Sequence, residues 1–439
     1  MAAGTQGKLM KLKNIGRAAL ATALSLGIGF GAIACSRDYT VAYVYAISKS
    51  TGSVAAFAVD YQSGALTQID GSPFSASGTN PVPVAAVAAP SGKFIYVINN
   101  FTSSIEVYAV GTDGKLYGQS TPSTLGSFPT SATIDSTGSF LYVTVTLQPG
   151  YTTASPGKGE LEIFPINSTT GALGTPTAVP VGNNPVSVTV GQPYCYTGTG
   201  SVTQNASCNG GAGHNVVYAY VLDQEGSKTQ PTAVPAVLGF SQNMSTGALT
   251  MLSGSTCTTV ASAICTGYAA GVLPTGIAEE PTSRYVYVTD ANTNQILGYQ
   301  IGSNATGNLT GLVSSPTATG LYPMSLTIDP RGKFLLTANY NSGTIGSYTI
   351  NIADGSLGGV AGTSAATTGT GPTCVTIEPA LGIYVYASDL ISNEISGEQM
   401  NASTGALSGI INTPFPTSAL PSCVVAVANG AHAQSIVNP

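Results

Sequence analysis

The chain of 439 residues has 13 Lys and Arg against 19 Asp and Glu, and only 7% of its residues are charged. An acidic chain without a basic cluster excludes a nucleic-acid-binding role. With 54 Gly, 26 Pro, 22 Tyr and no Trp, the composition is typical of many short strands joined by tight turns, and it indicates an all-β fold. The length favours one closed repeat domain over several small domains.

Residues 1–34 have the pattern of an export signal. Four basic residues precede an apolar stretch, 18–34, that is short for a membrane span and ends in Ala-Ile-Ala. Cys35 follows directly, and the sequence around it resembles a bacterial lipobox. We therefore expect Cys35 to be the lipidated first residue of the mature protein, in contact with the outer membrane or cell surface through this lipid. Cleavage by ordinary signal peptidase is the alternative.

The N-terminal strands of the mature chain begin out of phase with the rest. Segments 44–47, 54–59 and 66–69 are predicted strands without an innermost strand before them. At the other end, 424–427 has the character of an innermost strand, and only a polar tail, 430–439, follows it. We expect the two ends to complete one sheet, because this leaves no free sheet edge.

A repeat fills residues 35–429. It consists of Pro-x-x, a short apolar strand, a Pro/Ser-x-Gly turn and a Tyr-Val-rich strand, with a period near 49 residues. Its prolines are Pro81, Pro129, Pro185, Pro274, Pro323, Pro372 and Pro421. This period is that of one four-stranded propeller blade, and counting innermost strands predicts a single seven-bladed β-propeller.

Three further strands follow each innermost strand. The innermost strands are expected at 132–134, 186–190, 326–328, 375–377 and 424–427. The Tyr-Val strands are expected at 94–99, 140–145, 217–222, 285–290, 334–339 and 384–389, and third strands at 105–110, 161–166, 296–301 and 345–350. A fourth strand follows a turn glycine at 114, 171, 247, 355 and 405.

Six cysteines remain when Cys35 is set aside, which in an exported protein indicates disulfides. Cys195 and Cys208 share one insertion, and Cys257 and Cys265 share another. Cys374 and Cys423 occupy the same place in the last two repeats, so we expect these three pairs to be bonded, with other pairings or free thiols as alternatives. Spacings for a zinc site are absent from the sequence, so no metal or other cofactor is predicted.

The repeat resembles a known family. The runs from Pro323 to Ala338 and from Pro81 to Asn99 are similar to the YVTN-type propellers and to the wider lactonase family that includes 6-phosphogluconolactonase. The resemblance spans 40–429 and implies a seven-bladed propeller whose ligands bind at a channel mouth, where second strands end. Polar residues stand at those ends, so Asn99, Asp223, Asp290, Asn339, Tyr340 and Asp389 are the candidate ligand-binding residues; turn formation is the alternative for each.

The resemblance also implies acid–base or electrophilic catalysis by His, Arg and Glu at the mouth, but this sequence departs from that pattern. His214 lies in an insertion and His432 in the tail. Arg284 and Arg331 lie in turns expected on the opposite face, and Lys49 is one of few cations expected at the mouth. We therefore assign no catalytic residue to this sequence from the resemblance.

Four insertions lengthen the repeat, at 146–159, 191–215, 224–236 and 253–273. All but the second are expected at the mouth, where long loops favour recognition of a small molecule or an envelope protein. We therefore expect an exported, non-catalytic binding or scaffold lipoprotein of the lactonase-like family. The alternative is a lactonase, similar to 6-phosphogluconolactonase, that hydrolyses a sugar lactone.

Overall fold

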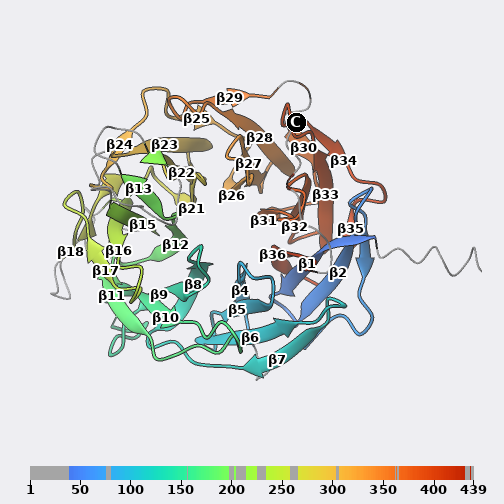
Figure 1. Cartoon of the computed structure of the whole chain (residues 1–439), viewed down its shortest axis with the longest axis horizontal. Coiled ribbons are helices and arrows are strands. Elements are labelled where there is room, and N and C mark those ends of the chain that lie inside the picture. The colour runs from blue at the N-terminus through green and yellow to red at the C-terminus, as the bar shows by residue number, and fades with distance from the viewer. Residues whose placement is uncertain are drawn as a thin grey trace, which may run out of the picture. The chain divides into compact units, whose positions relative to one another are not determined.

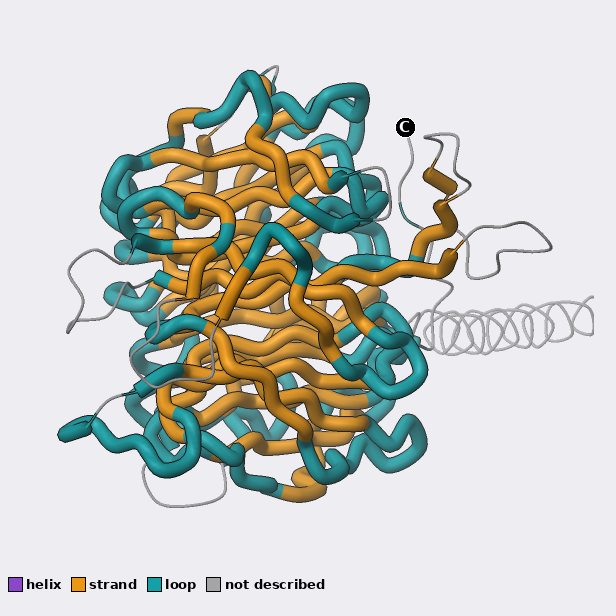
Figure 2. The backbone as a smooth tube through the Cα atoms, turned by 90° about the vertical axis from the view of Figure 1, so that its left-hand side faces the viewer, coloured by secondary structure: helices purple, strands orange, loops and turns teal. Residues whose placement is uncertain are grey.

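The computed structural model describes residues 39–75, 81–155, 157–196, 202–203, 214–224, 234–257, 265–302, 306–360, 362, 365–430 and 436. Every regular element among these residues is a β-strand. Residues from Val41 onward form one compact unit, in which blades follow one another around a central axis (Figure 1). Seen from the side, loops gather at the two ends of the strands (Figure 2).

The first blade joins both ends of the chain. Its strand order is β3 (Leu66–Gln68), β2 (Val54–Asp60), β1 (Thr40–Ser48) and β36 (Pro421–Ala428). Strands β1 and β36 are antiparallel, with Ala42 opposite Ala428 and Ser48 opposite Pro421. The closure predicted from the out-of-phase ends is confirmed, and we call this sheet blade 1.

Blades 2, 3 and 4 follow in chain order. Blade 2 contains β4 (Pro83–Ala88), β5 (Phe94–Asn99), β6 (Ser104–Val110) and β7 (Leu116–Ser120), and blade 3 contains β8 (Ser127–Ile134), β9 (Phe140–Leu147), β10 (Gly159–Pro165) and β11 (Thr177–Val181). Blade 4 contains β12 (Pro185–Val190), β15 (His214–Asp223), β16 (Ala236–Gln242) and β17 (Leu249–Met251), with the added strands β13 (Tyr194–Tyr196), β14 (Val202–Thr203) and β20 (Tyr268–Ala269). A separate hairpin joins β18 (Thr256–Cys257) to β19 (Cys265–Thr266).

Blades 5, 6 and 7 each have a fifth short strand on the third strand, which the sequence did not predict. Blade 5 contains β21 (Pro274–Glu279), β22 (Tyr285–Asp290), β23 (Gln295–Ile301), β24 (Leu309–Gly311) and β25 (Thr317–Ala318). Blade 6 contains β26 (Pro323–Ile328), β27 (Phe334–Asn339), β28 (Thr344–Ile350), β29 (Leu357–Gly359) and β30 (Ala365–Thr367). Blade 7 contains β31 (Pro372–Ile377), β32 (Tyr384–Asp389), β33 (Glu394–Met400), β34 (Leu407–Gly409) and β35 (Phe415–Pro416).

Five of the seven innermost strands begin at the repeat proline, and the four of these whose apolar runs were predicted begin one to three residues earlier than expected. In blade 3 the strand begins at Ser127, two residues before its proline. Each innermost strand has a register shift just after its first proline, as between Pro323 and Ser325. A proline lacks an N–H and is tolerated at the first position of a strand or at a bulge. In blade 2 the strand starts at Pro83 instead of Pro81, because Pro83 is the residue that pairs with Asn99.

In each blade a hydroxyl group donates a hydrogen bond to the carbonyl of a turn glycine in the next blade. The hydroxyl of Tyr96 in blade 2 donates to the carbonyl of Gly171 in blade 3 at 3.0 Å. The same bond recurs in the pairs Tyr45–Gly114, Tyr142–Gly247, Tyr220–Gly307, Tyr287–Gly355 and Tyr386–Gly64. In blade 6 Leu336 takes the place of the tyrosine, and the Ser347 hydroxyl donates to the Gly405 carbonyl instead. The Tyr-Val motif therefore specifies contact between blades as well as strand formation.

Two structural constraints require glycine at the positions whose carbonyls accept these bonds. Gly171 has a φ of +71°, a conformation that other residues rarely adopt. A Cβ atom there would also lie 2.4 Å from the ring of Phe94, the first residue of a second strand in the neighbouring blade. The turn glycine thus allows the aromatic ring to pack against backbone, which brings adjacent blades together.

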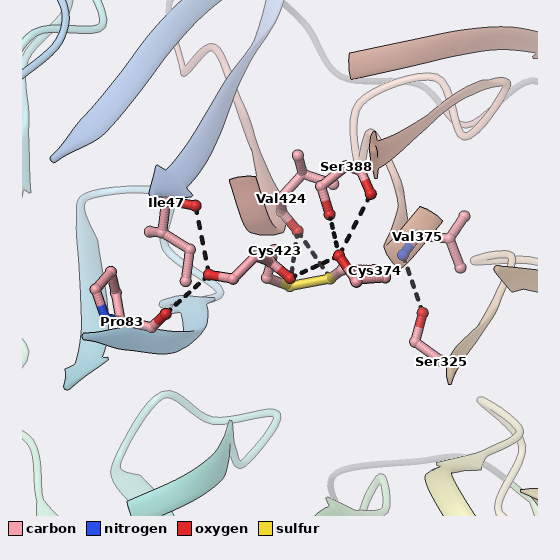
Figure 3. The surroundings of a disulfide bond; sticks show 10 residues. Ile47, Pro83, Ser325, Cys374, Val375, Ser388, Cys423 and Val424 are labelled. Carbon is pink, nitrogen blue, oxygen red and sulfur yellow. Dashed lines mark hydrogen bonds between the residues drawn. A yellow bond between two sulfur atoms is a disulfide. The ribbon is translucent and has the colours of Figure 1, made fainter. Parts of the chain in front are cut away.

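Two disulfides are present in the described residues. Cys257–Cys265 closes the β18–β19 hairpin, and Cys374–Cys423 joins the innermost strands of blade 7 and blade 1, with Cα atoms 4.9 Å apart. Beside the second bridge, the Ser422 hydroxyl donates to the Pro83 carbonyl at 2.8 Å (Figure 3). These two predicted pairings are confirmed. The third, Cys195–Cys208, lies outside the described residues.

Candidate binding site at the mouth face

One end of the propeller collects the residues that the sequence singled out. In every blade the first proline of the innermost strand pairs with a residue near the end of the second strand, which we call the strand-end residue. These are Ser48, Asn99, Val145, Asp223, Asp290, Asn339 and Asp389. The shared register places them at one face, which we call the mouth face, together with the loops that cross from one blade to the next.

The predicted Asp and Asn residues among them are buried. Asn99, Asp223, Asp290, Asn339 and Asp389 are each at most 3% exposed. Their side chains bond to groups within their own blade and its crossover loop. A direct role in ligand binding stays a prediction for these five residues.

Asp223 and Asp290 hold the crossover loops that lead into their blades. Asp223 accepts the backbone N–H of Asn184 at 2.8 Å. Asp290 accepts those of Val272 and Leu273 at 2.8 and 2.9 Å. Burial raises the pKa of Asp290, but these N–H groups and those nearby outweigh it, so its pKa lies below the ordinary value. Both carboxylates therefore use their acceptor capacity in positioning backbone.

Asp389 has a different electrostatic environment. Burial raises its pKa to about 6, although the Ser396 hydroxyl, at 2.6 Å, and the N–H of Gly369, at 3.2 Å, favour the ionised form. Its Oδ1 atom is buried without a hydrogen-bond partner. Asp389 is thus a carboxyl group that can take up a proton in mildly acidic solution.

Asn339 bonds to two hydroxyl groups. Its Oδ1 accepts from Thr337 at 3.1 Å, and its Nδ2 donates to Thr344 at 3.2 Å. In blade 2 the corresponding Nδ2 of Asn99 donates to Glu106 at 3.4 Å, while its Oδ1 has no partner. These amides thus organise the end of each blade.

The residue that follows each strand-end residue, which we call the rim residue, has a different character. The seven rim residues are Lys49, Asn100, Thr146, Gln224, Ala291, Tyr340 and Leu390. Lys49 is the single cation among them; the residue is exposed, and partial desolvation by the surrounding protein lowers its pKa. The other six are amide, hydroxyl, aromatic or apolar.

Some rim residues connect neighbouring blades. Asn100 donates to the Pro129 carbonyl at 2.7 Å, and Gln224 to the Pro274 carbonyl at 3.0 Å. The residue after the first proline performs this function elsewhere: the hydroxyls of Thr130, Thr275, Thr373 and Ser422 donate to the next blade. In blade 6 the two corresponding residues are Met324 and Tyr340. The half-buried Tyr340 lies beside Tyr322, with ring centroids 6.2 Å apart, and the two rings form an aromatic pair at the rim.

A carboxyl pair in blade 3 was missed by the sequence reasoning. Glu160 and Glu162, on β10, are 7% and 0% exposed. Glu162 accepts the N–H groups of Leu125 and Gly126 at 3.0 and 2.8 Å. Burial, followed by the charge and hydrogen bond of Glu162, raises the pKa of Glu160 to about 7. The Glu-Leu-Glu alternation was the available signal, because it places both carboxyl groups on one face of a strand.

The insertions at 146–159 and 253–273 approach each other at Lys158 and Cys257. The Nζ of Lys158 lies 3.9 Å from the Sγ of Cys257, and burial lowers the lysine's pKa. His432 lies outside the described residues, as does the side chain of His214. In the described ranges, clusters of three or more His, Cys, Asp or Glu fit to hold a metal ion are absent. The described residues also contain no helix long and apolar enough to span a membrane.

Seven antiparallel blades around one axis define a seven-bladed β-propeller. The sequence matches the family model of lactonase seven-bladed β-propellers over residues 33–190 and 235–377. The chain therefore belongs to the lactonase family of seven-bladed β-propellers, as its repeats indicated. Comparison with curated proteins finds no match.

Solved structures of similar fold include two proteins named for lactone hydrolysis. A candidate 6-phosphogluconolactonase from Bacteroides fragilis is 17% identical with a TM-score of 0.60, and covers 89% of this chain and 99% of its own. The periplasmic gluconolactonase of Pseudomonas aeruginosa is 16% identical with a TM-score of 0.62, over 89% and 99%. At these identities the likeness shows the fold alone.

Proposed function

We propose that this protein is an exported, non-catalytic binding propeller of the cell envelope, and that it binds a small uncharged polar molecule at the mouth face. The proposal rests on one observation: at this face the buried carboxylates bind backbone N–H groups, while side chains that are mostly uncharged or aromatic line the rim. The carboxylates of Asp223 and Asp290 are occupied by backbone N–H groups. The rim beyond them offers an aromatic pair, Tyr322 and Tyr340, which suits stacking against a neutral ring.

Export to the envelope is part of the proposal and rests on separate observations. Residues 1–34 have the pattern of a signal, and Cys35 stands where a lipidated cysteine is expected. The two disulfides fit an oxidising compartment, where such bonds persist. An envelope protein at the same face is an alternative partner.

Binding is tested with a soluble form that begins after Cys35. Saturation-transfer NMR with a panel of neutral mono- and disaccharides should detect a ligand, and Tyr340→Ala should weaken its binding at least tenfold. Tyr117→Ala is the matched control, because Tyr117 is 53% exposed and lies on β7, away from the rim. Equal weakening by both variants, or binding unaffected by Tyr340→Ala, contradicts the proposed site.

Lactone hydrolysis is the second candidate, and the Glu160–Glu162 pair favours it. A carboxyl group with a pKa of about 7 can exchange a proton near neutral pH, as a general acid or base must. Turnover of gluconolactone or its 6-phosphate that disappears in Glu160→Gln would replace the binding proposal with an enzymatic one. Absence of turnover across a lactone panel would remove this candidate.

A further inference from the structure

Three bulky residues at the mouth face hold a backbone conformation that side chains rarely adopt. They directly precede the repeat prolines of blades 3, 6 and 1, and the φ angles are +58° at Phe128, +58° at Tyr322 and +53° at Leu420. A positive φ brings the Cβ atom close to the following carbonyl oxygen, so glycine is the usual residue there. We call these three the collar residues.

Blade 7 shows that this backbone path does not need a bulky side chain. Gly371 stands at the corresponding position with a φ of +72°, and its carbonyl accepts the N–H of the rim residue Leu390 at 2.9 Å. In blade 6 the Tyr322 carbonyl accepts the N–H of Tyr340 at 2.9 Å in the same way. Glycine and a bulky residue therefore support the same crossover.

The preceding blade holds each collar residue in place. The N–H of Leu420 donates to Asn393 Oδ1 at 2.7 Å. Equivalent bonds join Tyr322 to Asn294 and Phe128 to Ser103. The three acceptor residues also have positive φ angles, so three collar residues and three acceptors make up six of the eight non-glycine residues with positive φ in the described ranges. Backbone strain of this kind persists where the surrounding structure enforces it, and it gathers at binding sites.

The collar side chains are not part of a hydrophobic core. None of the three occurs in the seven hydrophobic clusters that the described residues form. Leu420 is 42% exposed, and Phe128 and Tyr322 are half-buried. Since neither the backbone path nor the core requires bulk at these positions, we look for its role at the surface.

The collar lies at the edge of an uncharged opening. The innermost strands surround the central axis (Figure 1), so the residues before their first prolines stand at the inner edge of the mouth face. These seven residues are Val82, Phe128, Asn184, Leu273, Tyr322, Gly371 and Leu420. None of them is charged, and most are apolar or aromatic. Such an opening favours an apolar group over a charged one.

We infer that the ligand of the mouth face carries an apolar group, which the collar residues contact beside the polar part that the rim binds. The inference rests on the proposed function, and it narrows the ligand class to a neutral sugar with an alkyl or aryl substituent. The collar residues come from blades 1, 3 and 6, which lie on different sides of the axis (Figure 1), so the apolar group is held at the centre of the face. Tyr322 belongs to both parts of the site, because its ring pairs with that of Tyr340.

The test compares two glucosides that differ only in the alkyl group. In ligand-observed NMR with the soluble protein, hexyl β-glucoside should bind at least about tenfold more tightly than methyl β-glucoside, because each buried methylene group contributes about fourfold in affinity. Equal binding of the two, or no saturable binding of hexyl β-glucoside at millimolar concentrations, overturns the inference.

A third probe separates this inference from the proposed function. Equal binding of the two glucosides removes the collar site but leaves a sugar-binding mouth face. Hexanol that binds as tightly as hexyl β-glucoside supports the collar site and contradicts the proposed function, because the sugar then contributes nothing.

Variants locate the alkyl group. Phe128→Gly combined with Leu420→Gly removes two collar side chains and should abolish the gain of hexyl over methyl β-glucoside. Ile352→Gly is the matched control: Ile352 is 57% exposed in the turn after β28, on the opposite face, so its loss should leave the gain intact. A gain that persists in the collar variant, or that disappears in the control, overturns the inference.

Urea denaturation shows whether the collar side chains serve the fold instead. Phe128→Gly and Leu420→Gly should each unfold at or above the wild-type urea concentration, because glycine adopts a positive φ without the steric cost. Leu273→Gly is the control: Leu273 also precedes a repeat proline but has no positive φ, so this variant should unfold at a lower urea concentration. If the collar variants lose as much stability as Leu273→Gly, their bulk serves folding and the inference is overturned.

Discussion

Replacing Cys374 and Cys423 together by serine should lower the free energy of unfolding by about 4 kcal/mol. The bridge spans 49 residues, and the chain-entropy model gives this value for a loop of that length. The bond joins blade 7 to blade 1, the sheet built from both chain ends. Its loss allows the unfolded chain more conformations, and it removes a covalent restraint at the boundary where the ring closes.

The second disulfide provides an internal control. Cys257–Cys265 spans only 8 residues, so the same model gives about 2.5 kcal/mol for replacing that pair by serine. Urea denaturation of the soluble protein, followed by tyrosine fluorescence and far-UV circular dichroism, measures both losses. The reasoning is refuted if the hairpin variant loses as much stability as the closure variant, or if the closure variant unfolds at the wild-type urea concentration.

Three further outcomes are expected. Tyr96→Phe should cost about 1 to 3 kcal/mol in urea denaturation, because the Gly171 carbonyl loses its buried donor; a cost equal to that of the exposed Tyr117→Phe contradicts this. Burial raises the pKa of Glu279 to about 8 from 4.5, so the contribution of Glu279 to the free energy of unfolding should be greatest below pH 4.5 and fall by up to about 5 kcal/mol between pH 4.5 and 8; Glu279→Gln should remove this component of the pH profile, and an unchanged slope between these pH values rejects it. Cys35→Ser should abolish incorporation of a clickable fatty acid, and labelling that persists rejects lipidation.

The fold was predictable because the repeat encodes contacts as well as strands. Tyr96 and its counterparts recur at one place in each blade, and the glycines that accept their hydroxyls recur at another. The number of blades can therefore be counted from the recurring tyrosine and glycine residues. Only blade 6 breaks the pattern, and there Ser347 supplies the hydroxyl from the next strand.

The site was less predictable, because a side chain's role depends on what the crossover loop brings to it. Asp290 is the last residue of a second strand and Tyr340 directly follows one, but Asp290 is buried under a loop whereas Tyr340 lines the rim. Sequence spacing places both at the mouth face without separating them. The Glu160–Glu162 pair acquires its character from burial within blade 3, which strand spacing does not report.

The antiparallel pairing of β1 with β36 also determines from which face of the propeller a group joined to either strand extends. Ser48 and Pro421 pair at the mouth face, so the opposite ends of these strands, at Thr40 and Ala428, leave from the other face next to each other. A fluorescent protein, an affinity tag or an immobilising linker joined directly before Thr40 or after Ala428 therefore begins on the side away from the mouth. Surface-coupled versions of this propeller should consequently present the rim to solution whichever end carries the linker.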